Sequence, residues 1–239
     1  MVVLTSISPT HILGDIQNTA MSTWHAAGYK VYSLNSKEEI ELIKDKYPFV
    51  TFVPDNRCYE NKALHGKTYI SIASFFDFGE TLTDNVIAIV NSDIHLKYDK
   101  VIMDKITGII NKNGFVIGKR YNYVESFNDG RIEGAGIDFF CVNRECLPCF
   151  PRTYQFVMGQ CWWDYWLPTL ALKCGIPLFK IIHPLLYHKR HPLQWSQELW
   201  YKLADLFCQD TGTVFNRRVP QQASTIIHNT FYDKAIPIR

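Results

Sequence analysis

The sequence lacks the long apolar segment that a membrane-spanning helix requires. Its buried-looking run Val86–Val90 is far shorter than the ~20 residues that cross a bilayer. It also lacks the basic flank and apolar stretch of a secretory signal. Charge of one sign is not in excess, since 25 Lys and Arg face 23 Asp and Glu, so neither nucleic acid nor an anionic membrane is the expected partner. We therefore expect no transmembrane segment and a cytoplasmic protein, or one held at a membrane face by partners.

Paired cysteines, repeats and linkers are scarce as well. Seven scattered cysteines make no disulfide scaffold, and the C-x-x-C pair Cys146 and Cys149 has no second pair to complete a zinc site. We interpret these thiols as small hydrophobic groups, with a redox pair as the weakest alternative. The organisation expected is one domain over residues 1–200, with a nucleotide-binding half at 1–120 and an acceptor half at 121–200, followed by an extension at 201–239 that packs on it.

What is present is an alternation of apolar runs and amphipathic stretches in the first half of the chain. Hydrophobic residues make up 47% of the sequence, enough for a sizeable core. Strands that alternate with helices favour an α/β layer fold with a largely parallel sheet. The expected strands are residues 1–6, 30–34, 49–53 and 86–90, and the expected helices are 15–27, 36–46 and 67–78. Ser36 with Glu39 three residues later is a capping box that begins the second of these helices.

Ligands of such sheets bind beyond the carboxyl ends of the strands, so the residues that follow each strand are candidates for a site. Asn91-Ser92-Asp93 follows the apolar run 86–90. An acidic side chain there is costly unless it is paired or binds a cation, which makes Asp93 a candidate site residue. The alternative is a turn or helix cap, because all three residues are turn formers. Small polar residues also follow the first two strands: Thr5, Ser6, Ser8 and Asn35.

Two further segments of the second half carry candidate chemistry. Residues 156–168 hold three Trp and a Tyr around a single carboxylate, Asp164, and desolvation by such a wall raises the proton affinity of a general base. The alternative is a helix start with Asp164 in its first turn and the Trp residues in the core. Residues 183–192 hold His188, Lys189, Arg190 and His191, which suit a metal or a phosphate, although an incidental surface cluster is the plainer interpretation and Pro192 favours a loop.

Together these segments resemble the nucleotide-sugar-dependent glycosyltransferases of the A-fold (GT-A). The resemblance covers residues 1–195. It depends on the order along the chain of Thr5-Ser6-Ile7-Ser8-Pro9, the D-x-D-like Asn91-Ser92-Asp93, the strand Gly136–Phe140, Gly159 with Trp163-Asp164, and a late histidine, His188. It implies a single GT-A-like, Rossmann-like domain with a central, mostly parallel mixed sheet flanked by helices and a C-terminal appendage.

The resemblance also implies a role for each site residue. Asp93 and His188, with His191 in reserve, would bind Mn²⁺ or Mg²⁺, although Asn91 replaces the first acid of the D-x-D element. Asp164 would be the general base of an inverting reaction; in a retaining enzyme it would instead contact the acceptor. The donor nucleotide would contact Thr5, Ser6, Ser8, Asn35, Lys67, Asn91, Ser92 and Asp93, and the sugars would contact Arg120, Asp138, Trp162 and Trp163.

The function implied is metal-assisted transfer of a hexose or deoxyhexose from a nucleotide-diphosphate sugar, with a UDP-sugar favoured, to a hydroxyl of a glycan or other glycoconjugate. One alternative is a non-catalytic nucleotide- or carbohydrate-binding module whose D-x-D site is degenerate. A nucleotidyltransferase is disfavoured, because the loop Ser6–His11 has neither the glycine nor the Lys or Arg of a phosphate-binding loop.

Overall fold

The computed structural model describes residues 1–192, 196–214 and 220–239 as a mixed α/β fold. The strands are β1 (Val2–Thr5), β2 (Lys30–Asn35), β3 (Val50–Pro54), β4 (Val86–Val90), β5 (Ile94–Leu96), β6 (Phe115–Tyr123), β7 (Arg131–Asn143), β8 (Leu178–Ile181), β9 (Leu186–Lys189) and β10 (Ile236–Ile238). The α-helices are α1 (Ile16–Ala26), α2 (Lys37–Ile43), α3 (Lys62–His65), α4 (Ile72–Thr81), α5 (Lys100–Ile110), α6 (Trp163–Lys173), α7 (Gln197–Thr211) and α8 (Pro220–Lys234). Short 3₁₀ helices are Lys44–Lys46, Asn56–Tyr59, Phe127–Asp129 and Arg144–Cys149.

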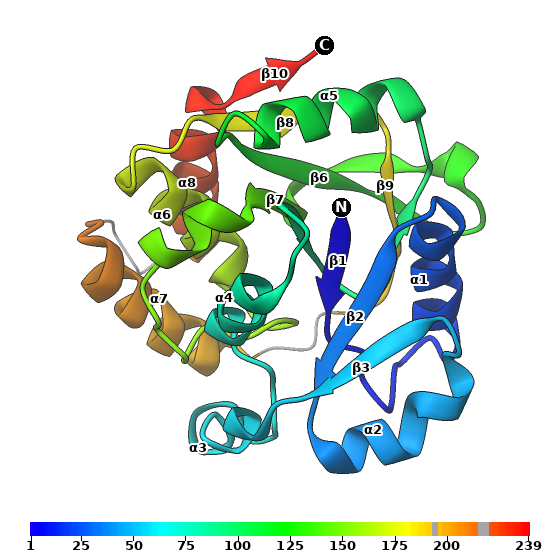
Figure 1. The fold of residues 1–239 in the computed structure, drawn as a ribbon. Helices are drawn as coiled ribbons and strands as arrows, with labels where there is room; N and C mark the ends of the chain where they lie inside the picture. Colours follow the sequence, from blue (N-terminus) through cyan, green and yellow to red (C-terminus); the bar gives the residue numbers. More distant parts are fainter. Residues whose placement is uncertain (193–195, 215–219) are drawn as a thin grey trace.

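The central sheet has the order β10-β8-β6-β7-β4-β1-β2-β3 (Figure 1). Strands β3, β2, β1 and β4 are mutually parallel, β7 is antiparallel to β4 and β6, and β8 and β10 continue parallel to β6. Because β7 is antiparallel to both β4 and β6, β6 has the same direction as β4. The carboxyl ends of β1, β2, β4 and β6 therefore lie at one edge of the sheet. Strand β5 pairs with β9, and β9 pairs with the end of β6, which adds a small second ladder at that edge. The predicted mostly parallel α/β sheet is confirmed.

Alternation along the strands explains why helices cover both faces of this sheet. In β4, Ile87 and Ile89 belong to one hydrophobic cluster, whereas Ala88 and Val90 belong to the other. The first cluster contains the apolar faces of α4, α6, α7 and α8, and the second contains those of α1, α2 and α5. Figure 1 shows α6, α7 and α8 gathered together, away from α1 and α2. An apolar residue at every position is what a strand covered on both faces requires.

The predicted strands at 1–6, 30–34, 49–53 and 86–90 are all present, as are helices within 15–27 and 36–46. Ser36 and Glu39 form the expected capping box at the start of α2. The predicted helix at 67–78 instead begins at Ile72, because the Ser71 hydroxyl accepts a hydrogen bond from the Ala73 N–H and caps it. Just before the helix, residue 71 forms a β-bridge with residue 157, and backbone hydrogen bonds join Ile70 to Met158 and Ile72 to Phe156, which no local pattern predicts.

Residues 183–192 are not the single loop that Pro192 led us to expect. Strand β9 occupies 186–189 within them, and its backbone pairs with β5 on one side and β6 on the other. The seven cysteines are free, and four of them are buried as small apolar groups. None of the helices in the described ranges combines the length and the apolar character needed to cross a membrane.

The C-terminal segment shares the core of the preceding residues. In α7, Trp200 and Phe207 are buried, and their rings lie 4.7 Å and 5.0 Å from the ring of Trp162. In α8, Phe231 lies 6.1 Å from the ring of Tyr165, and β10 adds to the sheet beside β8. Residues beyond 200 therefore supply part of the apolar cluster that supports α6.

We expect Phe207→Ala to lower the free energy of unfolding by about 3–5 kcal/mol, because the ring is fully buried and its removal leaves a cavity. Urea unfolding followed by circular dichroism measures this loss. The control is Gln209→Ala, on the exposed face of the same helix, which should change stability by no more than about 0.5 kcal/mol. Equal stability of the two variants would show that α7 does not contribute to the core.

Candidate functional site

A cavity of about 1140 Å³ opens at the edge of the sheet where the carboxyl ends of β1, β2 and β4 meet. The loops after these strands form one side, and the extended segment 67–70 with residues 158–165 forms another. The end of β6, the middle of β7 and the end of β9 close the remaining side. Strand ends that are distant in the sequence thus converge on one hollow, as expected for a sheet of this kind.

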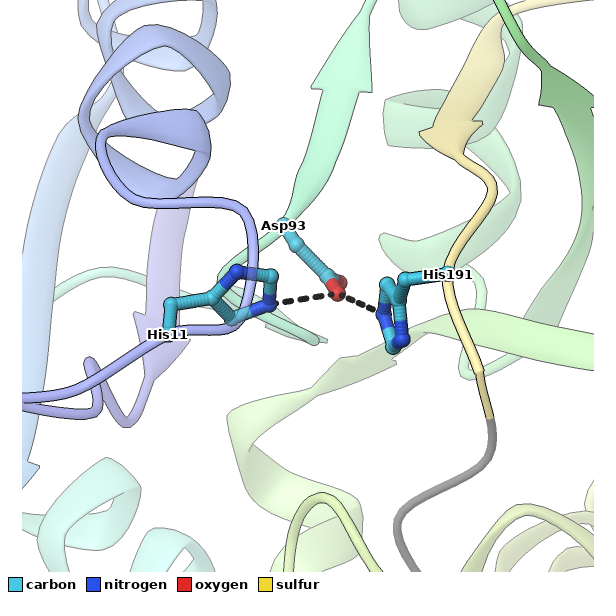
Figure 2. Close-up of side chains that lie close together, drawn as sticks. All are labelled: His11, Asp93 and His191. Atoms are coloured by element: carbon cyan, nitrogen blue, oxygen red, sulfur yellow. Dashed lines mark hydrogen bonds and ion pairs between the residues drawn. The ribbon is translucent and has the colours of Figure 1, made fainter.

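Two segments bring three histidines to Asp93. His11, from the loop before α1, and His191, just after β9, approach the same carboxylate oxygen of Asp93 from opposite sides (Figure 2). The Nε2 atoms of His11, His188 and His191 lie 3.5 Å, 3.3 Å and 3.2 Å from Asp93 Oδ2. The candidate ligand atoms of His11, Asp93 and His191 all lie within 4.8 Å of one another, close enough to share a metal ion.

Electrostatics at Asp93 favour the charged carboxylate. Burial alone raises the pKa of a carboxyl group, but here the hydrogen bonds from His11, His188 and His191 outweigh burial and hold the pKa of Asp93 well below its usual range. The hydrogen bond to Asp93 also raises the pKa of His191, because it outweighs the effect of burial, which lowers that pKa. Asp93 is therefore a fixed negative charge at the cavity. The turn interpretation is also confirmed, because Ser92 and Asp93 form a turn in which the Ile94 N–H donates to the Asn91 carbonyl.

Asp164 shows the opposite behaviour. It lies in the first turn of α6, as the structural alternative for this segment expected, and also lines the cavity. Burial and the neighbouring charge of Asp138 raise its pKa to about 8, although Arg120 and two backbone N–H groups oppose the rise. A carboxyl group with a pKa close to neutral pH is suited to accept a proton from a substrate. The helix-start interpretation of Asp164 is therefore confirmed, and its role as a general base stays a prediction.

Asp138 is held by two side chains at the base of the cavity. Asn91 donates its amide to one carboxylate oxygen, and Arg120 Nη1 lies 2.8 Å from the other. Gly136 makes room for this arginine, because a Cβ atom there would lie 2.6 Å from Arg120 Nε. Asn91 thus occupies the first position of the D-x-D-like element as a support for Asp138.

The other predicted nucleotide contacts differ in how free their polar groups are. Asn35 lines the cavity, but its amide donates to the Ile7 carbonyl and to Glu39, and its oxygen accepts from Ser33. Thr5 is fully buried outside the lining, with its hydroxyl directed at the sulfur of Met158. Ser6 and Ser8 line the cavity, as does Ser92, whose hydroxyl bonds to Gln17.

The predicted sugar contacts Trp162 and Trp163 belong mainly to the core. Each is 1% exposed, although both touch the cavity wall. Trp162 has a backbone φ of +77°, a strained conformation for a bulky residue, and its Nε1 donates to the Trp200 carbonyl. Lys67 is exposed at the rim beside the ring of Tyr69, and Arg190 is an exposed cation in the same lining.

Sequence reasoning missed several residues of this site. His11 lies in the loop after the first strand, where we looked for glycine and basic residues and gave the histidine no role. Asn122 and Glu133 support His188 from β6 and β7, and Gly136 accommodates Arg120. Histidine as a residue type pointed to a metal at His188 and His191, but nothing local in the sequence connects His11 with them.

Comparisons with known proteins support the fold. No protein-family model matches the sequence, and no curated protein matches it either. Among solved structures, S. aureus TarS 1-349 in complex with UDP-GlcNAc aligns with a TM-score of 0.51 at 11% identity, covering 96% of this chain and 72% of that one. The same protein in complex with UDP aligns with a TM-score of 0.51 at 10% identity, over 97% and 72% of the two chains. The predicted likeness is confirmed at the level of architecture: this chain shares its fold with S. aureus TarS.

Proposed function

We propose that this protein is a glycosyltransferase that moves a sugar from a nucleotide-diphosphate sugar to an acceptor hydroxyl. The observation that carries the proposal is a single cavity with two carboxylates in opposite states. Asp93 is held charged among histidines, and Asp164 has a pKa of about 8. Both lie at the carboxyl edge of an A-fold sheet, where this architecture binds its ligands.

A UDP-sugar is the donor we favour. The aligned structures of TarS hold UDP-GlcNAc and UDP on the same architecture, which supports a uridine nucleotide here. The cavity of about 1140 Å³ exceeds the ~300–1000 Å³ of ordinary small-molecule sites, so it has room for a donor and part of an acceptor. We propose that the group transferred is a hexosyl or deoxyhexosyl group, and that the acceptor is a glycan or other glycoconjugate.

A divalent cation fits the residues at Asp93. The charged carboxylate and the ring nitrogens of His188 and His191 are metal ligands, and their donor atoms already converge. When bound, a cation there offsets the negative charge that builds on the departing diphosphate. Lys67 and Arg190, both in the lining, supply further positive charge near such a group.

Asp164 acts on the acceptor in this proposal. Its ionised carboxylate accepts the proton of the acceptor hydroxyl while that oxygen attacks the anomeric carbon of the donor. The bond between the anomeric carbon and the diphosphate oxygen breaks, and its electron pair leaves with the nucleoside diphosphate. Attack from the face opposite the leaving group inverts the anomeric configuration. Arg120 and Asp138, whose charges act on Asp164, are suited to hold sugar hydroxyls.

The alternative is a nucleotide- or carbohydrate-binding module without catalysis. One observation favours it: Asn91 stands in place of the first acid of D-x-D, and its amide already donates a hydrogen bond to Asp138. Product analysis separates the two functions. A transferase converts a UDP-sugar to UDP in a protein-dependent reaction, whereas a module binds it unchanged.

We expect Asp93→Ala to abolish the increase in UDP affinity that a divalent cation produces, because the carboxylate that attracts the cation is lost. Isothermal titration calorimetry with and without Mn²⁺ measures this. The matched control is Asp104→Ala, an exposed carboxylate on α5 that pairs only with Lys100 among the described residues. An unchanged cation effect in Asp93→Ala would exclude Asp93 as the metal ligand.

We expect Asp164→Asn to reduce turnover by ~10² or more while leaving UDP affinity nearly unchanged, as for the loss of a general base. In the wild type, turnover should increase with pH up to about 8, because the base must be ionised to accept a proton. Initial rates of UDP release over this pH range provide the test. A parallel loss of UDP affinity in the variant would assign Asp164 to structure instead.

The same substitution should stabilise the fold, increasingly so at high pH. A carboxyl group with a raised pKa binds its proton more tightly in the folded than in the unfolded state, so its ionisation costs stability between about pH 4 and pH 8. Asn has no charge to bury. We expect the Tm difference between Asp164→Asn and wild type to be larger at pH 9 than at pH 5, with Asp45→Asn, exposed in the 3₁₀ helix after α2, as a control that shows no such trend.

A further inference from the structure

We propose that His11, Asp93, His188 and His191 form one preformed metal site that selects a transition-metal ion of the Fe²⁺ to Zn²⁺ class over Mg²⁺. The inference rests on the proposed function for the presence of a cation and deepens it by naming the cation. Three imidazole nitrogens and one carboxylate oxygen replace the oxygen-rich donor set that Asn91-Ser92-Asp93 led us to expect.

Three separate segments supply these side chains, and backbone pairing fixes the two that carry Asp93 and His188. His188 lies in β9 directly opposite Ile94, the residue after Asp93, in the β5–β9 ladder. His11 reaches the same carboxylate from the loop between β1 and α1. The donor atoms are separated by 3.1 Å between His188 and His191, and by 3.2–3.5 Å between Asp93 Oδ2 and the three rings. Atoms bound to one ion at about 2.0–2.1 Å lie about 3.0–3.4 Å apart, which matches the spacing of Asp93, His188 and His191. The donor atoms of His11, Asp93 and His191 lie within 4.8 Å of one another, so His11 must move toward the other donors to complete the set.

The ring nitrogens that point away from Asp93 fix the tautomers of two of the histidines. His191 Nδ1 lies 2.8 Å from the Pro192 carbonyl, which only accepts, so the proton is on Nδ1. His188 Nδ1 lies 2.9 Å from Asn122 Oδ1. The orientation of that amide is set in turn, because its nitrogen donates to Glu133 Oε2 at 2.7 Å. His188 therefore also carries its proton on Nδ1, and both Nε2 atoms present lone pairs.

These lone pairs face one another and a carboxylate. In the neutral rings, His188 Nε2 and His191 Nε2 lie 3.1 Å apart, and they lie 3.3 Å and 3.2 Å from Asp93 Oδ2. A metal ion accepts all three electron pairs at once, and a hydrogen bond from the distal nitrogen is what orients a ligating histidine. Asn122 and Glu133 are thus positioning residues for His188.

The composition of the site decides which ion it takes. Imidazole suits Fe, Co, Ni and Zn, whereas Mg²⁺ prefers oxygen ligands and gives up its water reluctantly. Three imidazoles with one carboxylate therefore favour the transition-metal ion, and a donor set already assembled in the fold allows it to bind before any nucleotide.

Metal-free protein titrated with Co²⁺, Zn²⁺ and Mg²⁺ tests this directly, with the visible absorption of bound Co²⁺ and calorimetry as readouts. We expect Co²⁺ and Zn²⁺ to bind without nucleotide at least ~10²-fold more tightly than Mg²⁺. His11→Gln and His191→Gln should each weaken Co²⁺ binding and change its absorption spectrum, and Asn122→Leu should weaken it by about 10-fold or more. His25→Gln, exposed on α1 and stacked on Phe49, is the matched control and should bind Co²⁺ as wild type does.

Mg²⁺ binding within ten-fold of Co²⁺ would overturn the proposal, and so would unchanged Co²⁺ binding in His11→Gln. The wild-type comparison of ions needs no variant, so a folding defect cannot obscure it. Titration of UDP into Co²⁺-loaded and Mg²⁺-supplemented protein separates the two proposals. Histidine-dependent Co²⁺ binding without UDP binding would support the metal site and contradict the proposed transferase. UDP binding that Mg²⁺ supports as well as Co²⁺ does would support the transferase and contradict the selective metal site.

Discussion

The pairing of β9 with β5 on one side and with β6 on the other is the constraint on which the candidate site depends. This ladder holds His188 opposite the residue after Asp93, and the chain leaves it at His191 beside the same carboxylate. Backbone hydrogen bonds from Lys97 to Leu185 and from Arg190 to Tyr123 extend the ladder at both ends. Three histidines and an aspartate can be brought together in this way without a helical metal motif, because strand register does what helix periodicity does elsewhere.

The opposite wall depends on packing. Trp162 adopts a strained left-handed conformation at the start of α6, and the aromatic residues of α7 surround its ring. Backbone strain of this kind costs of order 1–3 kcal/mol and persists only where the surroundings enforce it. Here it turns the chain so that Trp163 packs on Phe140 in the core while Asp164 faces the cavity. The C-terminal helices thereby support the carboxylate from behind.

The sequence predicted the parts of this structure that local physics determines. Apolar runs gave the parallel strands, Ser36 with Glu39 gave a helix start, and polar residues after Val90 marked the edge that carries the cavity. Contacts between distant segments were not predictable from the sequence. They include the bridge between residues 71 and 157, after which α4 begins, the pairing of the strand at 186–189, and the position of His11 beside Asp93. The burial of Trp162 and the internal bonding of Asn35 likewise depend on neighbours far along the chain.

The pair formed by Asn91 and Asp138 has a consequence for how this cavity keeps its charge. The two side chains meet across the antiparallel β4–β7 boundary, one as amide and one as carboxylate. An aspartate at 91 would face another aspartate and repel it, so the two positions can share only one negative charge between them. The negative charge of this pair is carried by β7, one hydrogen bond away from the end of β4. Exchanging the two residues together would leave the total charge of the cavity unaltered and only move it.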